Sequence, residues 1–268
     1  MSAVALASLA VSGSESKPGF KPPDSNDFVF PSAFGHSQYF TKPILLIVLS
    51  CLIVFVFYYA TSRKAAVVPS KLQFAGESVY GFVRNSLAQD VIGHEFMAYV
   101  PYLVTLFTFI LVNNVFGIIP FIQFPSFSRF SFPLVLALIP WVLFNFVGIR
   151  KHGFVSYFKT MLFPPGVPKW VYVLLTPIEF VSTIIVRPLT LSLRLFANMF
   201  AGHLLLLVFI LGGDYMLHNV TLLKVMSPFA FVMGIALTFF EFLVQCLQAY
   251  IFTLLSALYI AGALADEH

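Results

Sequence analysis

Residues 225–265 form an apolar run of 41 residues that contains one formally charged side chain, Glu241. Residues 172–212 form a second run of the same length. About 20 apolar residues are enough to cross the hydrocarbon core of a bilayer. The chain is 59% hydrophobic and only 10% charged, less than half the usual charged fraction of about 25%. A water-soluble domain of 268 residues cannot bury so much apolar surface. We therefore predict an all-α integral membrane protein.

The chain divides into a polar N-terminal arm and a membrane domain. The arm, residues 1–42, is rich in Ser, Pro and Gly. A processed leader and an outer-side contact with a neighbouring subunit are both open interpretations of it. The apolar residues 3–11 lack the preceding basic residue that is typical of a cleaved signal peptide. The membrane domain is residues 43–268. About five membrane-crossing helices are expected in it, at 43–62, 100–122, 131–149, 172–212 and 225–265, with an amphipathic surface helix at 71–98.

The last two runs are too long for ordinary spans. As one helix, 41 residues would be about 61 Å long, roughly twice the thickness of the hydrocarbon core. We expect two long, strongly tilted helices packed as a hairpin, with Pro177 and Pro188 as bend candidates in the first. The Lys and Arg residues that follow the first and third spans place the N-terminus outside and the C-terminus inside.

Polar side chains interrupt the apolar run at 172–212 on one helical face. At about 100° per residue, Arg187 and Arg194 lie about 20° apart, and Arg194 and Asn198 about 40° apart. His203 is turned by about 180° from Arg194. Arg187, next to Pro188, has a structural and a functional interpretation of equal weight.

A second polar stripe follows the last apolar run. Glu241, Gln245, Gln248 and Tyr259 have the spacing i, i+4, i+7 and i+18, which keeps them on one face. A buried charge costs roughly 2.5–3.5 kcal/mol on membrane-insertion scales, so such residues usually face protein or water and mark ion pathways. A polar line on each long helix predicts a hydrated path.

The residue types indicate proton chemistry beside a fixed charge. His203 and Glu241 are side chains that can relay protons, whereas the guanidinium of Arg194 is of a kind that does not release its proton in proteins. Facing a carboxylate on another subunit, Arg194 would favour the ionised form and block direct proton passage. The alternative for Arg194 is an ion pair with Glu241 within this chain, or snorkelling to the interface.

Three segments of the apolar runs have a distinctive order of residues, namely LSLRLFANMFAGHLL (191–205), LQAYIFTLLSALYIAGAL (247–264) and FTFILVNNVFGIIPF (107–121). They resemble subunit a of the F-type ATP synthase, the proton-channel subunit of its membrane sector. The resemblance runs from about residue 43 to the C-terminus, and it implies proton translocation through two offset half-channels against a rotating c-ring, coupled to ATP synthesis.

The resemblance also implies roles for single residues. Arg194 matches the family's essential arginine facing the c-ring, with Asn198 and Gln248 close to it. His203 and Glu241 match the pair that lines the outer half-channel, and Glu179 resembles an acidic position on the inner side. The chain itself would be non-catalytic, with c-ring subunits, peripheral-stalk b-type subunits and the lipid bilayer as partners.

Other classes of protein make different demands. A proton-coupled secondary transporter should show an internal repeat, and the patterns around Arg194 and Glu241 have no second copy. A non-conducting membrane scaffold would tolerate uncharged residues at these positions. We expect no bound nucleic acid and no cofactor. We also expect no metal site, since Cys51 and Cys246 do not have the spacing of metal ligands. The length favours a bacterial inner or plasma membrane over a mitochondrial inner membrane.

Overall fold

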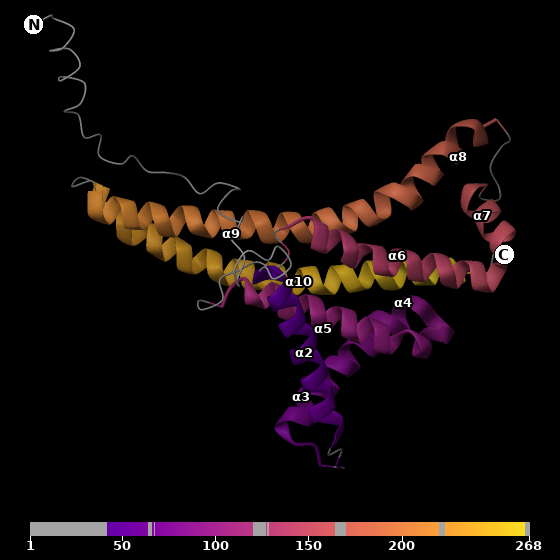
Figure 1. Ribbon diagram of the computed structural model, residues 1–268, viewed down its shortest axis with the longest axis horizontal. Coiled ribbons are helices and arrows are strands. Elements are labelled where there is room, and N and C mark those ends of the chain that lie inside the picture. The colour runs from indigo at the N-terminus through magenta and orange to yellow at the C-terminus, as the bar shows by residue number, and fades with distance from the viewer. Residues whose placement is uncertain are drawn as a thin grey trace, which may run out of the picture. The chain divides into compact units, whose positions relative to one another are not determined.

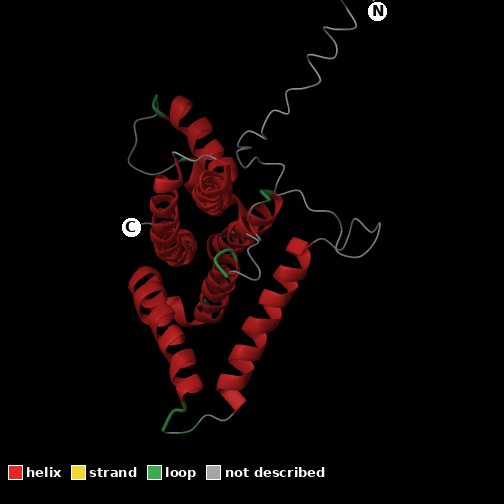
Figure 2. Ribbon diagram, turned by 90° about the vertical axis from the view of Figure 1, so that its left-hand side faces the viewer, coloured by secondary structure: helices red, strands yellow, loops and turns green. Residues whose placement is uncertain are grey.

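A computed structural model describes residues 42–63, 66, 68–119, 127, 129–163, 170–219 and 223–265. These residues form helices joined by loops, and no strand occurs among them (Figures 1 and 2). The chain divides into two compact units. Leu204–Ala236 belong to the smaller unit, and Phe30–His203 together with Leu237–His268 form the larger one. Residues 1–41 of the predicted arm lie outside the described residues.

The described part of the chain is almost entirely helical. In chain order they are α2 (Lys42–Arg63), α3 (Lys71–Phe82), the π-helix η2 (Val83–Gln89), α4 (Asp90–Ile92), the 3-10 helix η3 (Gly93–Ala98), α5 (Val100–Phe116), α6 (Ser131–His152), α7 (Phe154–Leu162), α8 (Tyr172–Val181), the π-helix η5 (Ser182–Val186), α9 (Arg187–Asn219), the 3-10 helix η6 (Leu223–Met226) and α10 (Ser227–Leu264).

Within the described residues, four helical stretches are long and apolar enough to cross a membrane. They are Pro43–Arg63, Ser131–His152, Tyr172–His218 and Lys224–Leu264, and the shorter apolar helix Val100–Phe116 makes a fifth candidate. The predicted all-α membrane fold is thus confirmed. The span expected at 100–122 differs in detail, because its helix ends at Phe116 and a turn begins at Gly117.

The segment expected as one surface helix at 71–98 is helical but not continuous. It consists of α3, the π-helix η2, the single turn α4 and the 3-10 helix η3. Gly93 has a φ of +78°, a backbone conformation that glycine adopts without steric cost, and it marks the end of α4. Val83 and Leu87 of η2 are fully buried, so this part of the segment packs into the protein core.

A short helix that the sequence analysis did not predict, α7, follows α6. Gly153, with a φ of +82°, ends α6 and begins α7. The ring of Tyr157 packs on α6 where Gly148 has no side chain, since a Cβ there would lie 2.2 Å from Tyr157 Cε2. Burial raises the pKa of the Tyr157 hydroxyl, despite the opposing effect of Arg187. The hydroxyl donates to Asn145 Oδ1 at 3.2 Å.

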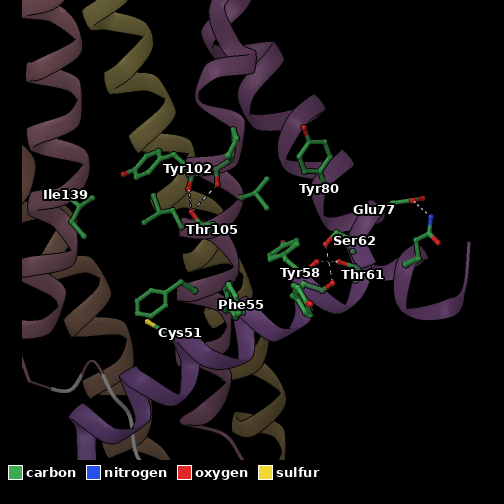
Figure 3. A pocket seen from close by; sticks show the side chains of 18 of the residues that line it. Cys51, Phe55, Tyr58, Thr61, Ser62, Glu77, Tyr80, Tyr102, Thr105 and Ile139 are labelled. Atoms are coloured by element: carbon green, nitrogen blue, oxygen red, sulfur yellow. Dashed lines mark hydrogen bonds between the residues drawn. The ribbon is translucent and has the colours of Figure 1, made fainter. Parts of the chain in front are cut away.

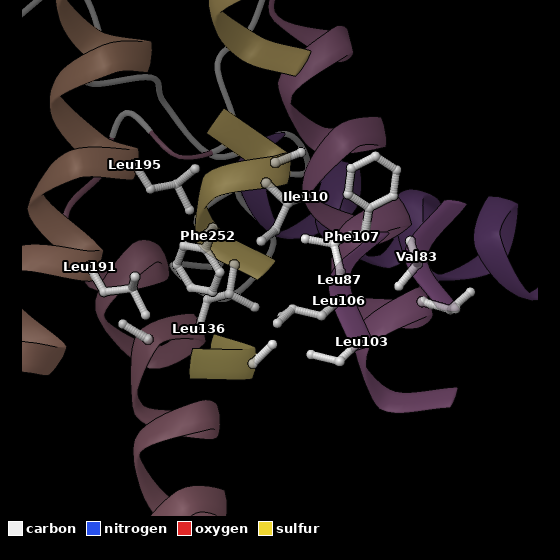
Figure 4. Close-up of a cluster of buried hydrophobic side chains, with 14 of the residues drawn as sticks. Val83, Leu87, Leu103, Leu106, Phe107, Ile110, Leu136, Leu191, Leu195 and Phe252 are labelled. Atoms are coloured by element: carbon white, nitrogen blue, oxygen red, sulfur yellow. The ribbon is translucent and has the colours of Figure 1, made fainter. Parts of the chain in front are cut away.

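The core of the larger unit joins α5, η2, α6, α9 and α10. Figure 4 shows Leu103 and Ile110 of α5 against Phe252 of α10, with Leu191 and Leu195 of α9 on the other side. After Gln248, the buried positions of α10 recur every three or four residues and are mostly small, namely Ala249, Phe252, Thr253, Ser256, Ala257, Ile260 and Ala263. Small residues let membrane helices come close together, so α10 is a central packing element of this unit.

Helix α2 contacts α5 near one of its ends and α3 near the other. Asn113 Nδ2 donates to Ser50 Oγ at 2.8 Å between α5 and α2, while Gly76 of α3 lies against Thr61 of α2. In Figure 2 the two helices that meet at the lower loop are α2 and α3. A cavity of about 1110 Å³ lies between these helices, α5 and α6 (Figure 3), and no residue of the predicted polar stripes lines it.

The smaller unit contains the end of α9 and the beginning of α10. Within it the two segments run antiparallel. A Cβ at Gly213 would lie 3.2 Å from Ala230, and one at Gly234 would lie 3.6 Å from Ile210. Ser227 Oγ donates to the Gly213 carbonyl at 2.8 Å. The turn is thus closed by a buried hydrogen bond and by glycines that allow close packing.

Candidate functional site

Within the larger unit, the predicted polar stripe of α10 faces α9. Three contacts mark this face. Gly202 lies against Glu241, Asn198 bonds to Gln248, and the Arg187 guanidinium lies over the ring of Tyr259. The residue numbers of α9 fall as those of α10 rise, so the two helices are antiparallel here. Gly202, Asn198 and Arg187 of α9 therefore face the polar stripe of α10.

Glu241 is held in a buried position at one end of this interface. Its side chain is only 7% exposed, and Gln245 Nε2 donates to Glu241 Oε1 at 3.0 Å. Gly202 gives the carboxylate room, because a Cβ there would lie 3.1 Å from the same oxygen. A buried carboxylate beside the backbone of a neighbouring helix is costly in a membrane, which points to a functional reason for its presence.

His203 follows Gly202 directly and is also buried, with 6% exposure. Its neighbour in sequence thus touches the Glu241 carboxylate. Both predicted proton-handling side chains are thus buried, and the backbone next to His203 meets the Glu241 carboxylate. An imidazole and a carboxylate are groups that can exchange protons with water.

Arg194 lies on a different face of α9. Its side chain is exposed, as is that of Asn198 one turn further along the helix. Among the described residues no carboxylate forms an ion pair with Arg194, so the alternative of an Arg194–Glu241 pair is not seen in this chain. The guanidinium is a fixed positive charge that this chain leaves open to its surroundings.

Asn198 connects the exposed face of α9 to the buried face of α10. Its Nδ2 donates to Gln248 Oε1 at 2.8 Å, and Gln248 is 2% exposed. Asn198 is four residues from Arg194, so the Asn198–Gln248 bond lies one helical turn from the arginine. The structure brings these two predicted residues together.

Tyr259 lies at the opposite end of the stripe from Glu241. Its ring centroid is 5.4 Å from Arg187 Cζ, and its ring packs against Phe144 of α6 with centroids 5.6 Å apart. The 18 residues between Glu241 and Tyr259 place them five turns apart along α10. Tyr259 therefore shares the stripe with Glu241 but not its immediate surroundings.

Asn114 of α5 is a site residue that the sequence analysis missed. Its Nδ2 donates to the Gln245 carbonyl at 3.0 Å, and the side chain is 2% exposed. Asn114 Oδ1, Gln245 Oε1 and Gln248 Nε2 are buried and have no hydrogen-bond partner among the described residues. Buried polar atoms usually pair with protein or with ordered water, so these atoms offer positions for water along the interface. The uncharged pair Asn113–Asn114 inside an apolar run was the available signal.

Glu179 of α8 is half-buried, and η5 lies between it and Arg194. Fifteen residues separate the two, which in a regular α-helix gives a phase difference of about 60°. A π-helical turn holds an extra residue. Counting η5 as one inserted residue reduces the phase difference to about 40°, so Glu179 lies closer to the Arg194 face than regular helical spacing indicates.

The described residues contain no cluster of His, Cys, Asp and Glu that could hold a metal ion. The free Cys51 and Cys246 lie on different helices. The chemistry of the site within this part of the chain is therefore that of protonatable and polar side chains.

Comparisons with known proteins agree on one family. A family model described as "ATP synthase A chain" matches residues 44–261. A protein of Nocardioides sp. named "ATP synthase subunit a" is 52% identical over 262 residues, covering 93% of this chain and 95% of the relative. A protein of Parafrankia sp. with the same name is 52% identical over 230 residues, covering 85% and 77%. One of Streptomyces lividans, again with that name, is 40% identical over 254 residues, covering 93% and 90%.

Proposed function

The chain belongs to the ATP synthase subunit a family, the proton-translocating subunits of the membrane sector, and we propose that its two long helices divide proton transfer between a buried acid–base pair and an exposed arginine. The observation that carries the proposal is their separation on α9. His203 is buried and directly follows Gly202, which meets the Glu241 carboxylate, whereas Arg194 is exposed. Protons then have a polar route inside the chain that does not pass through Arg194.

Proton uptake uses the buried end of the interface. Glu241 and His203 exchange protons with water that comes from the outer side of the membrane. Gln245 orients the Glu241 carboxylate through its 3.0 Å hydrogen bond. The buried amide groups of Asn114 and Gln248 extend the polar route toward the face of α9 that carries Asn198. The route delivers protons to a carboxylate on the rotating c-ring.

Arg194 separates the two half-channels. A guanidinium cannot release its proton, so it cannot pass protons directly from one side to the other. Its positive charge favours the ionised form of a facing carboxylate, and it therefore expels the proton that a ring carboxylate has carried around. The exposure of Arg194 and its lack of an ion pair with described residues support a partner on another subunit.

Proton release uses an inner half-channel that includes Glu179. The π-helical turn η5 brings Glu179 to within about 40° of the Arg194 face, which supports its place on the same path. Each proton that crosses a potential of 100 mV releases about 2.3 kcal/mol. Rotation of the ring carries this energy to the catalytic subunits, and this chain makes and breaks no ATP bond.

The partners follow from membership in a multi-subunit complex. The c-ring lies against the face of α9 that carries Arg194, and peripheral-stalk b-type subunits bind elsewhere on the membrane domain. The relatives are bacterial proteins, which supports a bacterial inner or plasma membrane. The N-terminus lies outside and the C-terminus inside.

Two variants of the complete complex in membrane vesicles test the proposal. Arg194→Ala should abolish coupled ATP synthesis while passive proton leak persists or rises, because the barrier between the half-channels is removed. Glu241→Gln should slow proton uptake without raising the leak, because the arginine barrier remains. Proton flux and ATP synthesis are measured on the same vesicles.

As a control for both variants, the amount of assembled complex in the vesicles is measured and compared with that of the wild type. Near-normal coupled synthesis in Arg194→Ala would contradict the barrier role. Unchanged flux in Glu241→Gln would remove Glu241 from the path and leave the barrier role standing.

A further inference from the structure

The junction between α8 and α9 departs from regular helix at Ser182–Val186, and this irregular segment ends eight residues before Arg194. Pro188 has no N–H and its ring clashes with the carbonyl one turn earlier. The preceding residues form the π-helix η5, in which the Arg187 N–H donates to the Ser182 carbonyl. A junction of this kind has fewer regular hydrogen bonds to set the rotation of the helix that follows. Contacts with neighbouring helices must therefore fix that rotation.

Helix α6 provides two such contacts, one helical turn apart. Trp141 Nε1 donates to the Thr183 carbonyl of η5 at 3.1 Å. The Phe144 ring lies over the Arg187 guanidinium, with Cζ 5.9 Å from the ring centroid. Trp141 and Phe144 are three residues apart on α6, and Thr183 and Arg187 are four apart on the opposing segment. Matching faces of the two elements are thus held at two points.

Helix α10 provides the third contact through Tyr259. The Arg187 Cζ lies 5.4 Å from the Tyr259 centroid, and the Tyr259 and Phe144 rings pack together at 5.6 Å. A guanidinium within about 6 Å of an aromatic ring is attracted to its face. Among the described residues no carboxylate forms an ion pair with Arg187. Two aromatic rings from two helices therefore hold this cation in place.

The position of Arg187 is transmitted to Arg194 along a continuous helix. Both residues belong to α9, which is α-helical from Arg187 onward. Their separation of seven residues corresponds to about 10 Å along the axis and a rotation of only about 20°. Whatever fixes the direction of Arg187 thus also fixes the face of α9 on which Arg194 lies.

We propose that Arg187, held between Phe144 and Tyr259, is a positioning residue that sets the rotation of α9 and thereby the direction in which Arg194 faces the ring. The inference rests on the barrier role proposed for Arg194. According to this proposal, Tyr259 acts through its aromatic ring, which holds Arg187. Its position on the stripe had led us to expect a role in the proton path instead.

Two pairs of substitutions provide the test. Those at Tyr259 separate the effect of its ring from that of its hydroxyl, and those at Arg187 separate the effect of its charge from that of its length. In the complete complex, Tyr259→Leu and Arg187→Met should lower the amount of ATP made per proton translocated several-fold, because a misdirected Arg194 no longer blocks leak. Tyr259→Phe keeps the aromatic ring and should keep the wild-type ratio of ATP made to protons translocated. Arg187→Lys keeps the positive charge and should retain part of that ratio. Leu258→Ala, at an exposed neighbouring position, is the matched control.

The readout separates positioning from general stability. A residue needed only for folding would lower the amount of assembled complex and leave the ratio of ATP to protons per complex unchanged, which would overturn the inference. A lower amount of ATP per proton in Tyr259→Phe would also overturn the inference, because the hydroxyl and not the ring would then be the group that matters. If Arg194→Ala loses coupling while Tyr259→Leu and Arg187→Met retain the wild-type ratio, this inference fails and the proposed function stands. If Arg194→Ala itself retains coupling, the proposed function fails.

Discussion

At the scale of single residues, the site depends on a glycine next to a histidine. Gly202 is the point where the backbone of α9 meets the Glu241 carboxylate. A charged group at mid-bilayer depth costs roughly 2.5–3.5 kcal/mol on insertion scales, so its immediate neighbours must be polar or very small. The Gln245 amide and the bare Gly202 backbone meet that condition.

Replacing Gly202 by alanine should disturb this contact selectively. A Cβ would lie 3.1 Å from Glu241 Oε1, closer than ordinary van der Waals contact, so the carboxylate must shift. We expect slower proton uptake in vesicles with the amount of assembled complex little changed. Gly212→Ala on the same helix meets no atom within 4 Å and should stabilise the helix by about 0.5–1 kcal/mol. Equal fluxes in the two variants would refute a functional contact at Gly202.

Helical phase explains which site residues the sequence could predict. Glu241, Gln248 and Tyr259 lie on one face of α10, and all three have neighbours on α9. Phase says nothing about what occupies the facing helix at each level, so the aromatic surroundings of Tyr259 were not predictable. Asn114 was missed for the same reason, because its bond to the Gln245 carbonyl joins residues 131 positions apart.

At the scale of helices, composition predicted the spans and local geometry determined their ends and breaks. The long apolar runs were sufficient for the membrane fold. Of the two bend candidates, Pro177 lies inside α8, and Pro188 is the second residue of α9, which directly follows the π-helix η5. The sequence did not reveal that the irregularity is a π-helix. The Thr183 carbonyl within it accepts a hydrogen bond from Trp141, which is 42 residues away in the chain. Helix α7 was missed because its nine residues are too few for a clear periodic signal.

The packing of α7 on α6 should fail when Gly148 gains a side chain. A Cβ there would lie 2.2 Å from the Tyr157 ring, which forces α7 away from α6. We expect Gly148→Ala to destabilise the chain by about 1–3 kcal/mol, the usual cost of overpacking. Thermal unfolding in detergent measures the loss.

A second substitution identifies the cause. Tyr157→Ala in the same chain removes the clash and should recover part of the stability lost in Gly148→Ala. Gly81→Ala, on α3 with open space around it, is the control and should be neutral or slightly stabilising. Additive losses in the double variant would show that the two residues do not compete for the same space.

At the scale of the whole chain, basic residues should determine which side of the membrane each loop faces. Arg63, Lys71 and Arg84 follow the first span, and Arg150, Lys151 and Lys159 follow the span at Ser131–His152. The loops on the other side contain few basic residues, namely Arg129 before α6 and Lys224 before α10. Cytoplasmic loops carry the excess of Lys and Arg, so α7 is expected inside and the α9–α10 turn outside.

Single cysteines test this orientation in a variant without Cys51 and Cys246. His218→Cys replaces an exposed residue near the end of α9, and Lys159→Cys replaces one on α7. A membrane-impermeant maleimide added to whole cells from which the outer barrier has been removed should label His218→Cys and spare Lys159→Cys. Inverted vesicles should give the reverse, because α7 then faces the reagent. The opposite result in both preparations would place the uptake end of the α9–α10 interface inside, and protons driving synthesis would then have to reach Glu241 from the wrong side of the membrane.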